Sequence, residues 1–259
     1  MDLGIAGRRA IVCGASRGLG RAVAGALAEA GAELVINARG ADELETAAED
    51  LRRRYGCAVH TLAGDLTTEA GCAKLKEAHP DADILINNAG GPPAGDWRDL
   101  SRDDWNNAAN RNMIGPIFLM RAYLDGMAER RFGRVVNITS IVVKMPKEML
   151  ELSVAARLGL TGAVKSIART VAGSNVTINN VLPELFDTDR LRQNLTTIGK
   201  KHGRSLDDEI VAHLEKTPAG RLGRPEELGA TCAFLCSQHA GFITGQSILM
   251  DGGFYPGLF

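Results

Sequence analysis

The sequence predicts an α/β protein built on a doubly wound, seven-stranded parallel sheet with helices on both faces. Two patterns carry this prediction: short apolar runs alternate with helical segments along the chain, and a glycine-rich turn follows the first run. Apolar strands that alternate with helices are typical of parallel sheets covered on both faces. Right-handed crossovers then give the doubly wound arrangement. We expect a single domain over residues 1–259.

The first half of the chain alternates strands and helices regularly. In the first expected helix, Val23, Ala26 and Leu27 lie on one face, and Gly31 is a typical helix stop. The second expected helix is charged and amphipathic. We expect strands at residues 10–13, 33–37, 57–62 and 84–86, and helices at residues 21–30 and 41–55.

The second half contains two long helices. One is expected over residues 105–130, bent near Gly115 and Pro116 because a proline inside a helix usually kinks it. The other is expected over residues 153–172, and strands are expected at residues 134–139, 176–181 and 247–250. The polar segment 191–217 breaks the rhythm. We interpret it as a lid-like excursion over the mouth of the active site, with an ordinary surface loop containing a helix as the alternative.

Composition excludes several classes of function. The chain has 259 residues, is 45% hydrophobic and carries a formal net charge of -1. A nucleic-acid partner is not expected, because no block of basic residues occurs. The densest basic cluster, Arg130, Arg131 and Arg134, is interpreted as solvated. No apolar run approaches the roughly 20 residues of a membrane-spanning helix, so no membrane association is expected.

The five cysteines indicate a reducing compartment. Their number is odd and their spacing irregular, which favours free thiols and a cytoplasmic location. Cys232 and Cys236 lie one helical turn apart. We interpret them as core residues rather than metal ligands, because free cysteine usually packs like a small hydrophobic side chain and no further ligands lie nearby. No metal site is expected.

The turn over residues 14–20 predicts a dinucleotide cofactor. It follows a strand and opens a helix, so its glycines allow a tight turn and close approach of the backbone to a pyrophosphate. A merely tight turn between strand and helix is the alternative. The residues expected to bind the cofactor here are Gly14, Ser16, Arg17, Gly18, Leu19 and Gly20.

The end of the second strand favours NADP(H) over NAD(H). Sites that prefer NAD often place an acidic residue there to bind the ribose 2′-hydroxyl. This chain has Asn37, Ala38 and Arg39 instead. Arg39, with help from Arg17, would pair well with a 2′-phosphate. NAD(H) stays the alternative cofactor, since either arginine can also simply face solvent.

The motifs, taken together and in order, resemble those of the short-chain dehydrogenase/reductase family, in particular the branch that includes 3-oxoacyl-[acyl-carrier-protein] reductases. The resemblance covers nearly the whole chain, from about residue 7 to residue 253. It rests on the glycine turn and on the following further matches: Asp65-Leu66, Asn87-Asn88-Ala89-Gly90, Asn112, Ser140, residues 221–227 and residues 245–253.

The resemblance implies roles for these residues. It implies a Rossmann fold, a small carbonyl or alcohol substrate, and a homodimer or homotetramer formed through the long helices at 112–130 and 153–172. Asn112 would hold a proton-relay water, and Ser140 would bind the substrate carbonyl. The remaining implied cofactor contacts are Asp65, Leu66, Asn88, Ala89, Gly90, Pro183 and Thr188.

The sequence departs from the family pattern at the centre of the active site. The family has a tyrosine thirteen positions after the serine and a lysine four further on. Here these positions hold Ser153 and Arg157. No tyrosine lies between Ser140 and residue 165, so a shift of register does not restore the motif. Arg157 can still bind ribose hydroxyls, but it cannot exchange a proton at neutral pH.

Proton transfer therefore needs another donor. Four charged residues lie between the two serines: Lys144, Lys147, Glu148 and Glu151. One of them can reach the site, or all four can be solvated loop charges. A second departure is Glu184, which follows Pro183 where the family usually has glycine. Its carboxylate lies either near the reacting centre or in solvent.

The sequence thus predicts an NADP-dependent oxidoreductase with a non-standard proton donor. Ser140, Ser153, Arg157 and Asn112 are the expected catalytic residues, and Arg157 is also an expected cofactor contact. Two alternatives stay open because fold alone does not fix function. One is a non-redox enzyme, such as an isomerase or lyase, and the other is a catalytically silent cofactor-binding protein.

Overall fold

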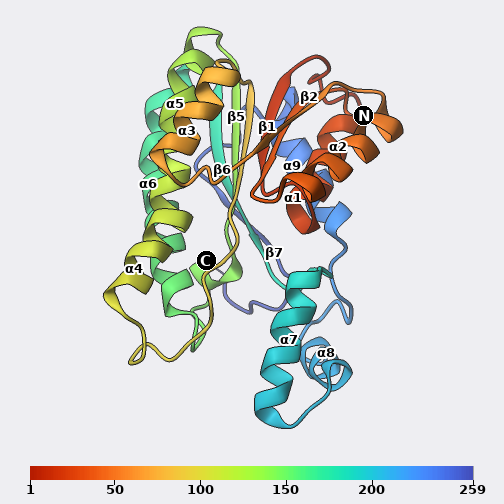
Figure 1. Ribbon diagram of the computed structural model, residues 1–259, viewed down its shortest axis with the longest axis vertical. Coiled ribbons are helices and arrows are strands. Elements are labelled where there is room, and N and C mark those ends of the chain that lie inside the picture. Colours follow the sequence, from red (N-terminus) through yellow and green to blue (C-terminus); the bar gives the residue numbers. More distant parts are fainter. Residues whose placement is uncertain (259) are drawn as a thin grey trace.

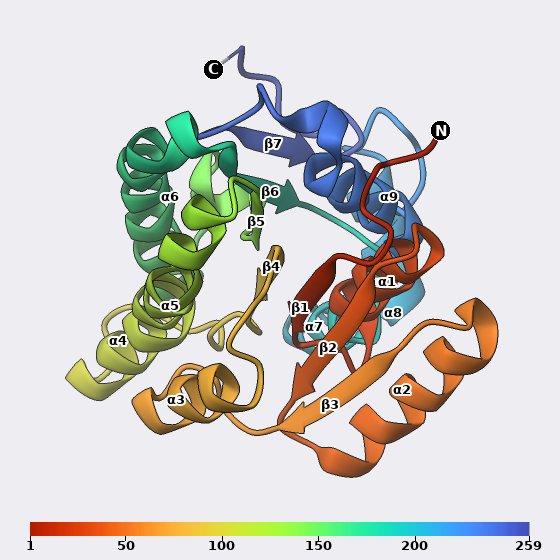
Figure 2. The same ribbon diagram turned by 90° about the horizontal axis from the view of Figure 1, so that it is seen from above.

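Seven parallel strands form one sheet between two layers of helices (Figures 1 and 2). A computed structural model describes residues 1–258, apart from the side chains of residues 201 and 202. The strand order is β3-β2-β1-β4-β5-β6-β7, which confirms the predicted doubly wound sheet. The strands are β1 (Arg9–Cys13), β2 (Glu33–Ala38), β3 (Val59–Ala63), β4 (Ile84–Asn88), β5 (Gly133–Ile138), β6 (Val176–Pro183) and β7 (Ser247–Met250).

The helices divide between the two faces of the sheet. Figure 2 shows α1 (Gly18–Glu29), α2 (Ala41–Tyr55) and α9 (Pro225–Cys236) on one side. The other side carries α3 (Glu69–Ala78), α4 (Arg102–Ala109), α5 (Gly115–Glu129) and α6 (Glu151–Val171). Each layer encloses its own apolar core against the sheet. Both faces of the central strands are therefore buried, as their continuous apolar sequence predicts.

The sequence gives no clear signal for α3 or α9. Helix α3 buries only Leu75, so it lacks the apolar periodicity that reveals an amphipathic helix. Helix α9 is apolar on most sides and packs closely on α1, which likewise leaves no clear period. The predicted long helix is interrupted next to Gly115, since a π-helical turn (Asn110–Ile114) separates α4 from α5.

The segment 191–217 contains most of one helix and the whole of another. Helix α7 (Asp189–His202) and helix α8 (Leu206–Leu214) form a hairpin that projects past the carboxyl ends of the strands (Figure 1). Gly203 ends α7 with a φ of 66°. Ser205 and Asp208 then cap α8 reciprocally through side chain and backbone.

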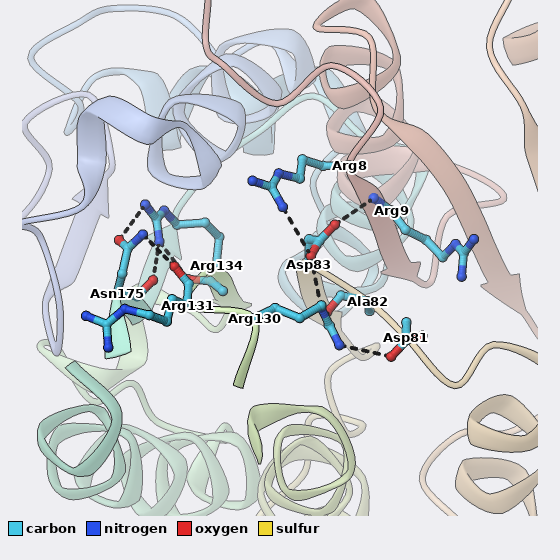
Figure 3. Close-up of polar contacts among 10 residues, drawn as sticks. Arg8, Arg9, Asp81, Ala82, Asp83, Arg130, Arg131, Arg134 and Asn175 are labelled. Carbon is cyan, nitrogen blue, oxygen red and sulfur yellow. Dashed lines mark hydrogen bonds and ion pairs between the residues drawn. The ribbon is translucent and has the colours of Figure 1, made fainter. Parts of the chain in front are cut away.

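The basic cluster at the opposite, amino edge of the sheet is not simply solvated, contrary to the prediction (Figure 3). Arg134 is 1% exposed, and its guanidinium donates to the carbonyl oxygens of Ser237, Gly133 and Asn175. Arg130 and Arg131 lie at the surface, but Arg130 donates to the Ala82 carbonyl oxygen and pairs with an aspartate. These arginines therefore bind the turn before β5 to neighbouring segments.

No described helix has the length and apolar character needed to cross a membrane. All five thiols are free, and Cys232 and Cys236 are fully buried in α9. Burial raises the pKa of Cys236 to about 12, so this thiol stays neutral within the core.

Candidate active site

The carboxyl edge of the sheet brings the predicted site residues together. The turn 14–20 follows β1, Ala89 follows β4, Ser140 follows β5 by two residues, and Glu184 follows β6. Because the strands are parallel and adjacent in the order β1-β4-β5-β6, these four segments meet along one edge. Ligand sites of doubly wound sheets lie at this edge.

The glycine turn is closely packed at Gly14 and Gly20. Gly14 has a φ of +62°, and a Cβ added to Gly20 would lie 2.2 Å from the carbonyl oxygen of Gly14. The amide of Asn88 donates to the same oxygen across 3.3 Å. The turn is therefore fixed against the end of β4. Gly18 also has a positive φ, but a Cβ added there would meet no atom closer than the Thr188 methyl carbon at 3.7 Å.

The amino end of α1 fits the pyrophosphate of a dinucleotide. Its N-cap residue, Arg17, makes no side-chain capping bond, and the first turn has no acidic residue. The unpaired N–H groups and the positive end of the helix dipole therefore favour an anion there. Thr188 caps α7 by accepting from the Leu191 amide and lies beside Gly18, so it borders the same space.

Asp65 follows β3 in the predicted cofactor region and lies near the charges of two arginines. Its carboxylate accepts from the Thr67 hydroxyl across 2.6 Å and from the Thr67 amide across 3.0 Å. The Thr67 hydroxyl, with the charges of Arg111 and Arg39, holds the pKa of Asp65 below its usual range. Arg39 is exposed, so its guanidinium is accessible to a ligand at the end of β2.

A row of asparagines crosses the sheet beneath the site. Asn87 donates to Asn137 across 2.8 Å, and Asn137 donates to Asn180 across 3.2 Å. Asn180 continues the row to the hydroxyl of Ser247 on β7. The three asparagines are register partners on β4, β5 and β6 and are at most 3% exposed. Sequence reasoning missed this row. Its signal is an asparagine near the end of each of three successive inner strands.

Arg157 lies at the centre of the site and bridges three elements. Its guanidinium donates to Ser153 Oγ (3.2 Å), to the carbonyl oxygen of Ile138 (3.1 Å) and to that of Ala89 (3.4 Å). Arg157 is 7% exposed. Burial lowers its pKa to about 10, so it keeps its charge at neutral pH. Among the residues that the structure describes, no carboxylate forms an ion pair with it.

The two predicted serines lie on different elements: Ser140 follows β5, and Ser153 belongs to α6. Ser140 precedes a short 3-10 turn (Ile141–Val143) and accepts from the Val142 amide across 3.4 Å. Ser153 lies in the first turn of α6, is 8% exposed and accepts from Arg157. Both hydroxyl groups keep a hydrogen for donation, because each serine oxygen here acts as an acceptor.

Asn112 lies in the π-helical turn between α4 and α5. It is 3% exposed, and its amide nitrogen donates weakly to the Ala108 carbonyl oxygen across 3.4 Å. Its Oδ1 atom is buried without a partner in the described part of the chain. Such an atom normally binds an ordered water or a ligand.

Lys147 and Glu184 form an ion pair at the mouth of the site. The Lys147 ammonium donates a hydrogen bond to Glu184 Oε1. The side chains are 27% and 13% exposed, respectively, so neither is a freely solvated charge. The Glu184 carboxylate is therefore largely shielded from solvent and paired with Lys147. The sequence does not reveal this pairing, because the residues lie 37 positions apart.

Comparison with known proteins identifies the family. Residues 14–255 match the sequence model of a family described as enoyl-(acyl carrier protein) reductase. The chain belongs to the short-chain dehydrogenase/reductase family. It is therefore a member of a family of oxidoreductases, as its motifs predict.

Relatives of this short-chain dehydrogenase/reductase match along its whole length. It is 34% identical to the 3-oxoacyl-[acyl-carrier-protein] reductase FabG of Vibrio harveyi, with 98% of this chain and 99% of that protein covered. It is 31% identical to the uncharacterized oxidoreductase YvaG of Bacillus subtilis, with both chains fully covered.

Solved structures confirm the fold of this family member. YwfH, described as an NADPH-dependent reductase involved in bacilysin biosynthesis, is 30% identical, with a TM-score of 0.92 over 98% of this chain and 100% of that chain. L-sorbose reductase from Gluconobacter frateurii, described in complex with NADPH and L-sorbose, is 28% identical. Its TM-score is 0.93, and both chains are fully covered.

Proposed function

We propose that this short-chain dehydrogenase/reductase uses NADP(H) to interconvert a carbonyl group and an alcohol on a small molecule. The observation that carries the proposal is the hydrogen bond from Arg157 to Ser153, formed beside Ser140 at the carboxyl edge of the sheet. This arrangement would offer two hydroxyl donors and one buried positive charge to a substrate at the carboxyl edge of the sheet. Such a site suits a substrate oxygen that gains negative charge during reaction.

The cofactor assignment rests on the uncapped start of α1 and on two exposed arginines. Arg17 and Arg39 would bind the 2′-phosphate that distinguishes NADP(H) from NAD(H). YwfH and L-sorbose reductase, which are described with NADPH, support this choice. The other residues that we assign to the cofactor are Gly14, Ser16, Gly18, Leu19, Gly20, Asp65, Leu66, Asn88, Ala89, Gly90, Arg157, Pro183 and Thr188.

A nicotinamide cofactor, when bound, would supply the hydride. The chain's own part is to hold and polarise the substrate oxygen. Ser140 and Ser153 donate hydrogen bonds to that oxygen, and Arg157 holds Ser153 in position while its charge offsets the developing negative charge. Asn112 Oδ1 would hold a water behind the site. Since Ser153 and Arg157 stand where the family has tyrosine and lysine, the proton comes from another group.

Two features outside the chemistry complete the proposal. The hairpin of α7 and α8 would act as a lid, because it begins at Thr188 beside the cofactor turn. A groove of about 1050 Å³ runs between α3, α4 and α5. Ile114 and Phe118, 38% and 41% exposed, line this groove, and a second copy of the chain would cover it in a homodimer or homotetramer.

A cofactor and substrate screen tests the proposal. NADPH consumption is followed by its absorbance with a panel of ketones and aldehydes, and binding of NADPH and NADH is compared by fluorescence titration. We expect tighter NADPH binding, turnover of at least one carbonyl, and a loss of roughly 10²–10⁴-fold in turnover for Ser140→Ala. Tight binding with no turnover would instead support a silent cofactor-binding protein. Conversion of a substrate without any absorbance change would support a non-redox enzyme.

A further inference from the structure

The ion pair of Lys147 and Glu184 joins two segments that border the reacting centre. Lys147 lies between the 3-10 turn that follows Ser140 and the start of α6, and Glu184 follows the last residue of β6. Lys147 Nζ donates to Glu184 Oε1. Its ammonium also lies 5.1 Å from the centre of the Phe254 ring. The ammonium is therefore held between a carboxylate and an aromatic face, two environments that favour a cation.

Strand register brings the backbone of Glu184 near that of Ser140. Ile138 on β5 is opposite Val181 on β6, and the Thr139 amide continues the ladder by donating to the Val181 carbonyl oxygen across 2.8 Å. Two more residues along each strand bring Ser140 to the level of Pro183, and Glu184 is the next residue. Neighbouring strands lie roughly 4.8 Å apart. The Glu184 backbone is thus about one strand spacing from Ser140.

The backbone that carries Glu184 is hydrogen-bonded to the end of β7. The Glu184 amide donates to the Met250 carbonyl oxygen across 3.0 Å, and Pro183 precedes it with a fixed φ. Leu185 follows with a φ of 52° and is 6% exposed. A non-glycine residue in this conformation persists only when its surroundings impose it. The backbone at Glu184 is therefore fixed by its surroundings, and Lys147 holds the carboxylate.

The other charged residues between the two serines have different surroundings. Lys144 lies 5.9 Å from the centre of the Tyr255 ring on the carboxyl-terminal segment. Glu148 is exposed, and Glu151 accepts from the Met149 amide across 3.2 Å. Of these four residues, Lys147 is the one that reaches the end of β6 through an ion pair. Its side chain is an amine, a type of group that serves as a general acid or base in enzymes, whereas a guanidinium does not.

We infer that Lys147 donates the proton to the substrate oxygen and that Glu184 positions it, an inference that rests on the proposed function. In the reduction, the carbonyl carbon gains a hydride from the cofactor, and the electron pair of the C=O π bond moves to oxygen. That oxygen takes a proton from Lys147 Nζ, so an O–H bond forms as an N–H bond breaks. The products are the alcohol, NADP⁺ and a neutral amine. The amine regains a proton from water, which its 27% exposure allows.

The decisive variant is Lys147→Arg, compared with Lys147→Ala. Arginine keeps the positive charge and the bond to Glu184 but does not release a proton near neutral pH. We expect both variants to lose roughly 10²–10⁴-fold in kcat with the carbonyl substrate found by the screen. Lys144→Ala is the matched control on the same loop and should stay within about twofold of wild type. NADPH affinity, measured by fluorescence, should be unchanged in all three variants.

Chemical rescue distinguishes a proton donor from a structural ion pair. Added ethylammonium chloride should restore part of the turnover of Lys147→Ala, whereas sodium chloride at equal concentration should not. Near-wild-type turnover of Lys147→Arg, or an unimpaired Lys147→Ala, would overturn the assignment while leaving the proposed function intact. If the wild-type protein fails to oxidise NADPH with every carbonyl compound in the panel, both the proposed function and this inference are overturned.

Discussion

Arg157 Nε donates a hydrogen bond to Ser153 Oγ across 3.2 Å, from one turn of α6 to the preceding one. The bond occupies an oxygen lone pair with a cationic donor, which leaves the serine hydrogen free to point elsewhere. The same guanidinium also binds carbonyl oxygens after β4 and at the end of β5. Ser153 is therefore held in one orientation by a group that is itself fixed to the sheet.

Replacement of Arg157 by methionine should lower both turnover and stability. Burial without a counter-ion lowers the pKa of Arg157 to about 10, a shift from 12.5 that corresponds to a cost of about 3 kcal/mol. Its three hydrogen bonds come from a charged donor and contribute roughly 1.5–3 kcal/mol each, so together they outweigh that cost. We expect Arg157→Met to lower the free energy of unfolding in urea by about 2–5 kcal/mol and turnover by at least roughly 10²-fold. Arg157→Lys, which keeps the charge, is the control. Strong destabilisation with turnover retained would assign Arg157 a structural role.

Two glycines of the cofactor turn should respond differently to alanine. At Gly20 a Cβ would lie 2.2 Å from a backbone oxygen, so Gly20→Ala should destabilise the fold by about 3 kcal/mol. At Gly18 the neighbouring protein atoms leave room, and the cost is the positive φ, about 1–2 kcal/mol. The new methyl group at Gly18 would lie where the pyrophosphate is proposed to bind. We expect Gly18→Ala to melt closer to wild type than Gly20→Ala and to bind NADPH at least about tenfold more weakly. Unchanged NADPH affinity would place the cofactor elsewhere.

Arg39 should set the preference between the two nicotinamide cofactors. Its exposed guanidinium follows β2, and a hydrogen-bonded pair with a phosphate is worth about 1.5–3 kcal/mol. Arg39→Ala should therefore weaken NADPH binding roughly 10- to 100-fold and leave NADH binding nearly unchanged. Arg53, an exposed arginine on α2, provides the control when replaced by alanine. Equal losses for both cofactors would contradict a role for Arg39 at the 2′-phosphate.

The parts of the fold that the sequence predicts are those with a strong local signal. The buried strands and the turn 14–20 are contiguous, so each is visible within a few residues. Helix α3 escapes prediction because it buries a single leucine, and α9 because it is apolar on most sides. The burial of Arg134 is also not predictable locally. The sequence around it does not reveal that its guanidinium will bind the carbonyl oxygens of Ser237 and Asn175.

The candidate site likewise contains residues that the sequence predicts and residues that it does not. Ser140, Ser153 and Arg157 follow from the resemblance to the family, and the structure brings Arg157 and Ser153 together. The pair of Lys147 and Glu184 forms because β5 and β6 lie side by side. The sequence around either residue does not reveal this pairing of strands. Position 184 departs visibly from the family pattern, but the direction of its side chain depends on the turn that ends β6.

Glu227 should make the stability of the folded protein fall as the pH becomes acidic. Arg221 binds its carboxylate through two hydrogen bonds of 2.9 and 2.7 Å, and the Arg224 amide adds a third. The hydrogen bonds from Arg221 above all lower the pKa of Glu227 to about 2 in the folded state. A depressed carboxylate pKa stabilises the folded protein above the unfolded value of about 4.5, and this stabilisation disappears as the pH falls towards 2. Glu227→Gln should therefore lower the melting temperature at pH 7, and its difference from wild type should shrink steadily below pH 4.5. Glu226→Gln, the exposed neighbour, is the control; a difference that stays constant with pH would argue against the pairing.

The groove beside α5 should determine the assembly of the protein. Phe118 is 41% exposed and lines this groove with Ile114, so water contacts two large apolar side chains in an isolated chain. Burial of such side chains in an interface is favourable by about 25 cal/mol per Å² of apolar surface. A glutamate at this position would instead bring a desolvated charge into the interface, at a cost of several kcal/mol. Phe118→Glu should therefore shift the mass measured by light scattering from an oligomer to a monomer. Val211→Glu on α8, where the side chain is 55% exposed, alters a comparable apolar position outside the groove and should leave the mass unchanged. A wild-type protein that is already monomeric, or a Phe118→Glu variant that keeps the wild-type mass, would show that this groove is not the interface.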